Sequence, residues 1–184
     1  MFSTSISSTI ELELLEVRHA DELYRVIDSN RGHLREWLPW VDTTLRPEDV
    51  EEFIRNKLRT FAQDDLPTCS IRETGVLVGV IDLHELKPHI QTASLGYWLA
   101  KDAQGRGIMT AACRAMLDYG LGLLKLNQIL LTAIDSNAKS IAIAERLGFN
   151  RDGVERRAHA MRGDLLDGAI YSMLASEWTL KREL

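Results

Sequence analysis

The sequence predicts a single α/β domain built on a mixed sheet. Short β-rich segments alternate with helical patterns along the whole chain, and no linker rich in proline, glycine or serine separates one part from another. The composition of 45% hydrophobic and 27% charged residues in 184 is that of a globular protein able to bury its own core. We therefore expect one domain over residues 1–184.

Seven segments carry the alternating or β-branched apolar residues of strands. Glycine-containing turns at residues 73–75 and 162–164 each join two of them. The expected strands are Ile10–Leu15, Thr68–Arg72, Val76–Glu85, Gln91–Leu99, Gln128–Ile134, Asn150–Arg162 and Gly168–Glu177.

Helical periodicity separates these strands. Pro39 ends a short helix, and Pro47 with the acids after it begins a long one. Ser136 or Asn137 caps the last helix, and Gly148 ends it as a left-handed residue. The helices are expected at residues 19–38 with an interruption at 30–32, at 47–63, at 107–123 and at 137–148. Two apolar stripes should face the core: Phe53, Ile54, Leu58 and Phe61, and Ile108, Ala112, Met116, Tyr119 and Leu123.

The stretch Gln104–Thr110 (QGRGIMT) lies between a strand and a helix, where a loop can bind phosphate. Gly105 and Gly107 permit close approach of a ligand and positive φ values. The free N–H groups of the first helical turn and the positive end of the helix dipole then face that ligand. The spacing is neither that of a P-loop nor that of a dinucleotide fingerprint. On these residues alone, a tight turn without a ligand explains the loop equally well.

Charge and cysteine content exclude several classes of protein. The net charge is −5 and no stripe of Lys and Arg is visible, which argues against direct binding to nucleic acid. Cys69 and Cys113 are too few for a disulfide framework or a structural zinc site, and no metal-ligand spacing appears. The chain shows neither a secretory signal nor an apolar run of about 18 residues. We expect a cytoplasmic protein without membrane contact or metal.

The order of these features resembles the GNAT superfamily of acyl-CoA-dependent N-acetyltransferases. The strand end GYWLA at 96–100, the loop at 104–109, NAKS at 137–140 and ERLGF at 145–149 carry the resemblance. The loop fits the superfamily pattern [RQ]xxGx[GA] except that Met109 stands where a small residue is usual. HLREWLPW at 33–40 is similar to the RimL type, whose members acetylate the N-termini of ribosomal proteins.

The resemblance implies a GNAT-like fold and acetyl-CoA as co-substrate. The sheet would be mixed and mostly antiparallel with about seven strands, helices on both faces and a splayed central strand pair. A homodimer is implied as well. The pyrophosphate would rest on the loop, with Arg106 and Lys139 supplying positive charge and the Met109 side chain pointing into the core. The implied cofactor-binding residues are Trp98, Leu99, Gln104, Gly105, Arg106, Gly107, Ile108, Met109, Thr110, Asn137, Lys139 and Ser140.

The resemblance also implies three catalytic groups. A backbone N–H near Trp98 or Leu99 would face the thioester carbonyl, and two side chains would transfer protons. His159 stands where RimL-type enzymes often have a glutamate base, and Ser140 would protonate the departing thiolate in place of a tyrosine one turn later. A strand histidine without a role, and a serine bonded to backbone, explain the same residues. His84 and Glu85 are alternative proton carriers.

The expected reaction is direct transfer of an acetyl group to a primary amine. An α-amine, with pKa about 7.7–8.0 against about 10.4 for lysine, is neutral over a hundredfold more often at neutral pH. We therefore expect the N-terminal α-amine of a protein, such as a ribosomal protein, as acceptor. A polyamine, an amino acid or an antibiotic is the alternative, and a catalytically silent acyl-CoA-binding module is another. Trp37 and Trp40 either line the acceptor groove, with His84 and Glu85, or anchor a helix end.

Overall fold

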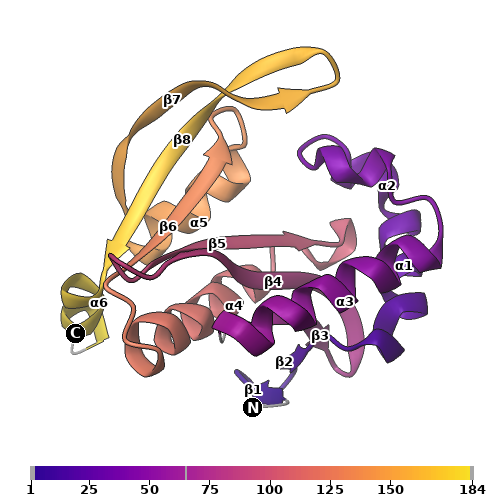
Figure 1. Cartoon of the computed structure of the whole chain (residues 1–184), viewed down its shortest axis with the longest axis horizontal. Helices are drawn as coiled ribbons and strands as arrows, with labels where there is room; N and C mark the ends of the chain where they lie inside the picture. Colours follow the sequence, from indigo (N-terminus) through magenta and orange to yellow (C-terminus); the bar gives the residue numbers. More distant parts are fainter. Residues whose placement is uncertain (1–2, 65, 183–184) are drawn as a thin grey trace. The chain divides into compact units, whose positions relative to one another are not determined.

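A computed structural model of the chain describes residues 3–64 and 66–182. The strands of this part form one sheet in the order β1-β2-β3-β4-β5-β6-β8-β7 (Figure 1). Their bounds are β1 Ser3–Ser5, β2 Ile10–Leu14, β3 Thr68–Glu73, β4 Val76–Lys87, β5 Thr92–Leu99, β6 Gln128–Ile134, β7 Asn150–Met161 and β8 Asp164–Leu174. The predicted α/β class is confirmed, and β1 is a short strand added to the seven expected.

Helices connect the strands at the predicted places, but the short helix expected to end at Pro39 ends at Leu34, and Pro39 instead begins a 3-10 turn. Asn137 caps α5, because its Oδ1 accepts a hydrogen bond from the Ser140 N–H at 3.2 Å, and Gly148 ends that helix with φ +78°. The predicted last strand, Gly168–Glu177, is wrong at both ends. It begins at Asp164, and it stops at Leu174 because the Glu177 carboxylate accepts from the Leu174 N–H and α6 follows. The α-helices are α1 Ala20–Ser29, α2 Arg31–Leu34, α3 Pro47–Asp64, α4 Ile108–Leu117, α5 Ala138–Leu147 and α6 Ala175–Arg182.

Shorter helical turns complete the chain, namely η1 Val17–His19, η2 Pro39–Asp42, η3 Lys101–Ala103 and the π-helix η4 Asp118–Leu123. The described helices include none that is both long and apolar enough to cross a membrane. The described residues form two compact units. The first unit consists of the residues up to Asp82 together with Tyr97–Ala112, and the second of Leu83–Gly96 together with the residues from Cys113 onward.

In the first unit, α1 and α3 lie side by side on the sheet (Figure 1). Leu23 of α1 and Ile54 of α3 pack with Leu77 and Val80 of β4 in one buried cluster. The predicted α3 stripe is right for Ile54 but wrong for Phe53, which is 40% exposed. Val50 takes the core position instead, and the Lys57 ammonium lies over the ring of Phe53.

In the second unit, the helix predicted to reach residue 123 changes from α to π geometry. The Leu124 N–H donates to the Tyr119 carbonyl, a bond five residues long, which adds a residue to the turn. Gly120 lies against β6, where an added Cβ would be 2.7 Å from Ile129 Cδ1. Because the π turn rotates the residues after it, Leu123 is 65% exposed rather than part of the core stripe.

The central strands β5 and β6 are parallel and pair only at their beginnings. Their ladder joins Thr92 to Gln128 and ends with Ser94 and Leu130, although β5 runs to Leu99 and β6 to Ile134. The predicted splayed strand pair is confirmed. Every other described pairing between neighbouring strands is antiparallel.

Candidate functional site

The glycine-rich loop has the backbone of an anion site. Gly105 and Gly107 have φ values of +76° and +77°, and an added Cβ at either position would meet no atom within 4 Å. Gly107 directly precedes α4, and its carbonyl accepts the first hydrogen bond of the helix from the Ala111 N–H at 3.0 Å. The first-turn N–H groups of α4 have no intrahelical acceptor and lie at the positive end of the helix. A phosphate group fits this arrangement.

Apolar side chains of the loop are directed away from the solvent. Ile108 is 2% exposed and Met109 is 6% exposed, although Met109 replaces the small residue usual in the loop pattern. The Met109 side chain therefore points into the core, as a pyrophosphate-binding loop requires of it. A large residue at this position therefore leaves the open side of the loop uncovered.

Polar side chains hold the loop from two directions within the first unit. Gln104 Nε2 lies 2.8 Å from His33 Nε2 in α2, and Arg106 Nη1 donates to Glu73 Oε1 at 2.8 Å. The Arg106 side chain is 49% exposed, so its charge reaches the solvent beside the loop but is partly compensated by Glu73. Neither His33 nor Glu73 could be assigned to the loop from the sequence, because both are far from it along the chain.

The end of β5 is pressed closely against β4. An added Cβ on Gly79 would be 2.4 Å from the Trp98 carbonyl oxygen and 3.1 Å from Leu99 Cα. The Ala100 N–H donates to the Val78 carbonyl at 2.8 Å, beside an irregularity in the β3–β4 register. The backbone from Trp98 to Leu99 is therefore fixed in place, as a hydrogen-bond donor to a developing oxyanion has to be.

The two predicted groove tryptophans have different surroundings. Trp40, in η2, packs on the core cluster of α1 and α3, and its ring lies 6.2 Å from that of Trp98 with an interplanar angle of 53°. Trp37, in the preceding turn, is half-buried. The structure thus brings the segment after α2 into contact with the end of β5, and Trp40 makes this contact.

In the second unit, the start of α5 presents the polar residues of the NAKS motif. Asn137 uses Oδ1 as the helix cap, which leaves its Nδ2 group as the donor for a ligand. Ser140 is half-buried in the first turn of the helix, and Lys139 is exposed. Ala144 is fully buried, so the position one turn after Ser140 faces the protein interior.

His159, in β7, packs its imidazole onto β8. Its Nε2 is buried without a hydrogen-bond partner, and an added Cβ on Gly168 would be 2.8 Å from that nitrogen. A β7 bulge precedes it, in which Arg157 has φ +59° and donates its N–H to Asp167 Oδ1. Nδ1 is therefore the ring nitrogen by which His159 would exchange a proton.

The alternative proton carriers lie at the far end of β4. Glu85 is exposed, has φ +55° and accepts a hydrogen bond from Ser94 Oγ at 3.2 Å. His84, beside it, is half-buried. Burial raises the pKa of the Cys69 thiol to about 12 and raises that of Cys113 as well, so neither is a thiolate nucleophile at neutral pH.

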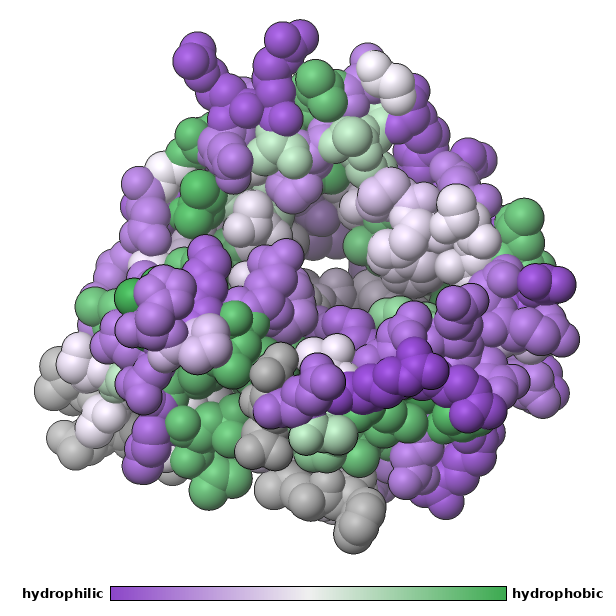
Figure 2. Space-filling model, viewed as in Figure 1, coloured by the Kyte–Doolittle hydropathy of each residue, from purple (hydrophilic) through white to green (hydrophobic). Residues whose placement is uncertain are grey.

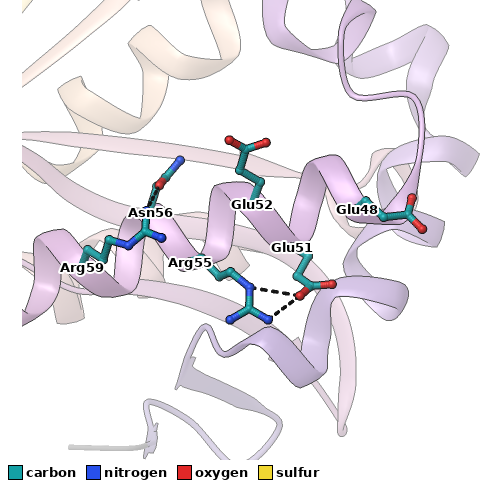
Figure 3. Close-up of a pocket in the computed structure, with 6 residues that line it drawn as sticks. All are labelled: Glu48, Glu51, Glu52, Arg55, Asn56 and Arg59. Atoms are coloured by element: carbon teal, nitrogen blue, oxygen red, sulfur yellow. Dashed lines mark hydrogen bonds and ion pairs between the residues drawn. The ribbon is translucent and has the colours of Figure 1, made fainter.

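A shallow surface depression lies on the outer side of α3 (Figure 3). All the residues that line it belong to that helix, where Arg55 pairs with Glu51, and Figure 2 shows a hydrophilic strip along it. A solvated helix face explains this feature. The lining residues are Glu48, Glu51, Glu52, Arg55, Asn56 and Arg59. In the described part of the chain, no group of three or more His, Cys, Asp or Glu residues is placed to hold a metal ion.

The fold and the loop together define an α/β enzyme that binds a phosphate-bearing co-substrate. The family description "Acetyltransferase (GNAT) domain" matches residues 9–150. The "Putative ribosomal N-acetyltransferase YdaF" of Bacillus subtilis strain 168 is 34% identical over 179 residues, 97% of this chain and 98% of that protein. The ribosomal-protein-serine acetyltransferase of Escherichia coli K12 is 25% identical over 169 residues, 92% of this chain and 94% of that protein.

A solved structure is similar over the same extent. It is the Microcin C7 self-immunity acetyltransferase in complex with acetyl-CoA and AMP, with a TM-score of 0.87, 26% identity and coverage of 92% of this chain and 94% of that one. The chain belongs to the GNAT acetyltransferase family. It is an N-acetyltransferase that uses acetyl-CoA.

Proposed function

We propose that the acetyl acceptor is the N-terminal α-amine of a protein, and specifically of a ribosomal protein. The contact between Trp40 and Trp98 carries this proposal, because it places an aromatic side chain next to the strand end expected to meet the thioester. A half-buried aromatic surface suits the first side chains of a peptide. The similarity over 97% of the chain to a protein named for ribosomal N-acetylation supports the same acceptor.

The proposed roles are those that the resemblance to GNAT enzymes implies for these residues. Acetyl-CoA supplies the acetyl group as an activated thioester, and the backbone at Trp98 and Leu99 donates a hydrogen bond to its carbonyl oxygen. His159 takes up the proton released by the amine as the new C–N bond forms, through Nδ1. Ser140 donates a proton to the sulfur as the C–S bond breaks. Asn137 and Lys139 contact the coenzyme, and His84 and Glu85 line the acceptor side.

An α-amine acceptor needs only a modest base. At neutral pH it is neutral over a hundredfold more often than a lysine side chain, which corresponds to about 3.5 kcal/mol. A histidine with one accessible nitrogen is sufficient for that task, whereas a lysine acceptor would need a stronger base. We place the enzyme in the cytoplasm and propose a homodimer, as the RimL resemblance implies.

The test is a thiol-release assay with acetyl-CoA and a panel of acceptors. Peptides that begin with Ser, Ala or Met are compared with the same peptides carrying an N-terminal cap, and with polyamines and amino acids. We expect turnover of the free peptides and none of the capped ones. Equal turnover of capped peptides would assign the acetyl group to lysine side chains. Turnover of small amines alone would overturn the protein acceptor and leave the acetyltransferase activity intact.

A further inference from the structure

The junction between α1 and α2 is attached directly to the cofactor loop. The Asn30 Oδ1 atom accepts from the Lys101 N–H at 2.9 Å, and His33 lies 2.8 Å from Gln104. Both contacts lie within the first unit and cross 71 residues of sequence. They join the segment that carries Trp40 to the segment that leads into α4.

The amide of Asn30 is oriented by its own hydrogen bonds. Its Nδ2 donates to the Val26 carbonyl at the end of α1, at 2.9 Å, so Oδ1 is the atom that faces Lys101. This side chain therefore ties the end of α1 to the first residue of η3. Lys101 and Gln104 are the two ends of the turn before the glycines, because the Gln104 N–H donates to the Lys101 carbonyl.

The segment behind these contacts is closed by a side-chain hydrogen bond. Arg31 in α2 donates to the Thr44 carbonyl at 2.9 Å, which closes residues 31–44 into one folded piece that includes Trp40. Trp40 in turn packs on Trp98. Residues 31–44 thus contact the cofactor loop through His33 and the end of β5 through Trp40.

We propose that His33 and Asn30 are positioning residues for the cofactor loop, and that they couple the acceptor-side segment to coenzyme A binding. Neither is proposed to contact the reacting atoms. Because Lys101 and Gln104 are held in place, Gly105 and Gly107 have the conformation that receives the pyrophosphate before coenzyme A binds. This lowers the conformational-entropy cost of binding. By reciprocity, an acceptor that fixes this segment raises the affinity for acetyl-CoA by the same factor as acetyl-CoA raises the affinity for the acceptor. Only this coupling rests on the proposed function, through the acceptor-side role of the segment.

The experiment measures coenzyme A affinity by calorimetry in a double-mutant cycle. We expect His33→Ala and Gln104→Ala each to weaken coenzyme A binding about three- to tenfold. The double variant should bind no more weakly than the single variant that has the lower affinity. His33→Gln, which can still bond to Gln104, should recover most of the affinity. His89→Ala, at an exposed histidine in the β4–β5 connection, is the matched control and should bind as the wild type does.

Kinetics separates positioning from general damage to the fold. In His33→Ala we expect a raised KM for acetyl-CoA with kcat kept at saturation, and an unchanged melting temperature without ligand. Multiplicative losses in the cycle, or unchanged affinity in His33→Ala, would overturn the proposal while leaving the acetyltransferase assignment standing. Failure of the wild type to bind coenzyme A at all would overturn both together.

Discussion

Gly79 lies so close to Trp98 that a single methyl group cannot be placed between β4 and β5. The added Cβ would be 2.4 Å from the Trp98 carbonyl oxygen, which is backbone and cannot rotate away. A residue in the middle of one strand thus sets the position of the neighbouring strand end. That end is the part of the first unit expected to meet the thioester carbonyl.

Gly79→Ala should therefore lower kcat by at least about tenfold, because the displaced backbone donor no longer meets the oxyanion. We expect a loss of stability of about 1–3 kcal/mol from the overpacking as well. Steady-state rates at saturating acetyl-CoA, together with urea denaturation, measure the two effects separately. Gly122→Ala is the control, because an added Cβ there meets no atom within 4 Å. A variant of Gly79 with full kcat would contradict the role of this strand end.

Gly107→Glu should abolish measurable binding of coenzyme A. The residue has φ +77° at the start of α4, so the substitution adds both backbone strain and a carboxylate facing the pyrophosphate. Gly107→Gln separates the two, because it has the same strain and nearly the same size without the charge. We expect Gln to weaken binding and Glu to weaken it by at least about tenfold more. Equal affinities of the two variants would argue against an anion at this loop.

Local signals in the sequence were sufficient for most of the fold. The cap at Asn137, the left-handed Gly148 and the two glycines of the loop depend on neighbours within a few residues, and each occurs as expected. Leu123 could not be predicted as exposed, because the apolar period of the sequence continues as for an α-helix, whereas the chain forms a π turn in which Gly120 lies against Ile129 of β6.

In the candidate site, too, local features could be predicted and contacts between residues far apart in the sequence could not. The loop was recognisable because its glycines precede a helix, but the side chains that bond to it were not. No role was predicted for His33, and nothing near it in the sequence points to Gln104. The orphaned Nε2 of His159 likewise depends on Gly168 in the facing strand. The sequence pattern indicates which residues share a face of one element. The contact of His33 is set by the packing of α2 on the turn before the loop, and that of His159 by the pairing of β7 with β8.

Glu22→Gln should destabilise the first unit at neutral pH and have little effect in acid. The hydrogen bond from Arg72 holds the pKa of Glu22 below its ordinary value of 4.5. A lowered carboxyl pKa adds stability above 4.5 that is lost as the pH falls through the folded-state pKa.

We expect a loss of about 1 kcal/mol at pH 7, reduced by solvent screening because the carboxylate is partly exposed. Urea denaturation at neutral pH and at successively lower pH values below 4.5 measures the difference. Glu52→Gln, at an exposed position of α3, should show no such dependence. A constant difference between Glu22→Gln and the wild type at both pH values would exclude the ion pair as its cause.

His159→Ala should lower the rate more at about pH 6.5 than at about pH 9, because an α-amine is already largely neutral at the higher pH and needs less help from a base. Gly168→Ala tests the same residue without removing it. Its added Cβ would be 2.8 Å from His159 Nε2 and would push the imidazole off β8. We expect the two variants to share one pH profile, measured as kcat/KM for a peptide acceptor. Gly153→Ala, at a glycine of β7 where an added Cβ meets no atom within 4 Å, should keep the wild-type profile. Equal losses at both pH values in His159→Ala would assign this histidine to the packing of the hairpin and leave proton uptake to another group.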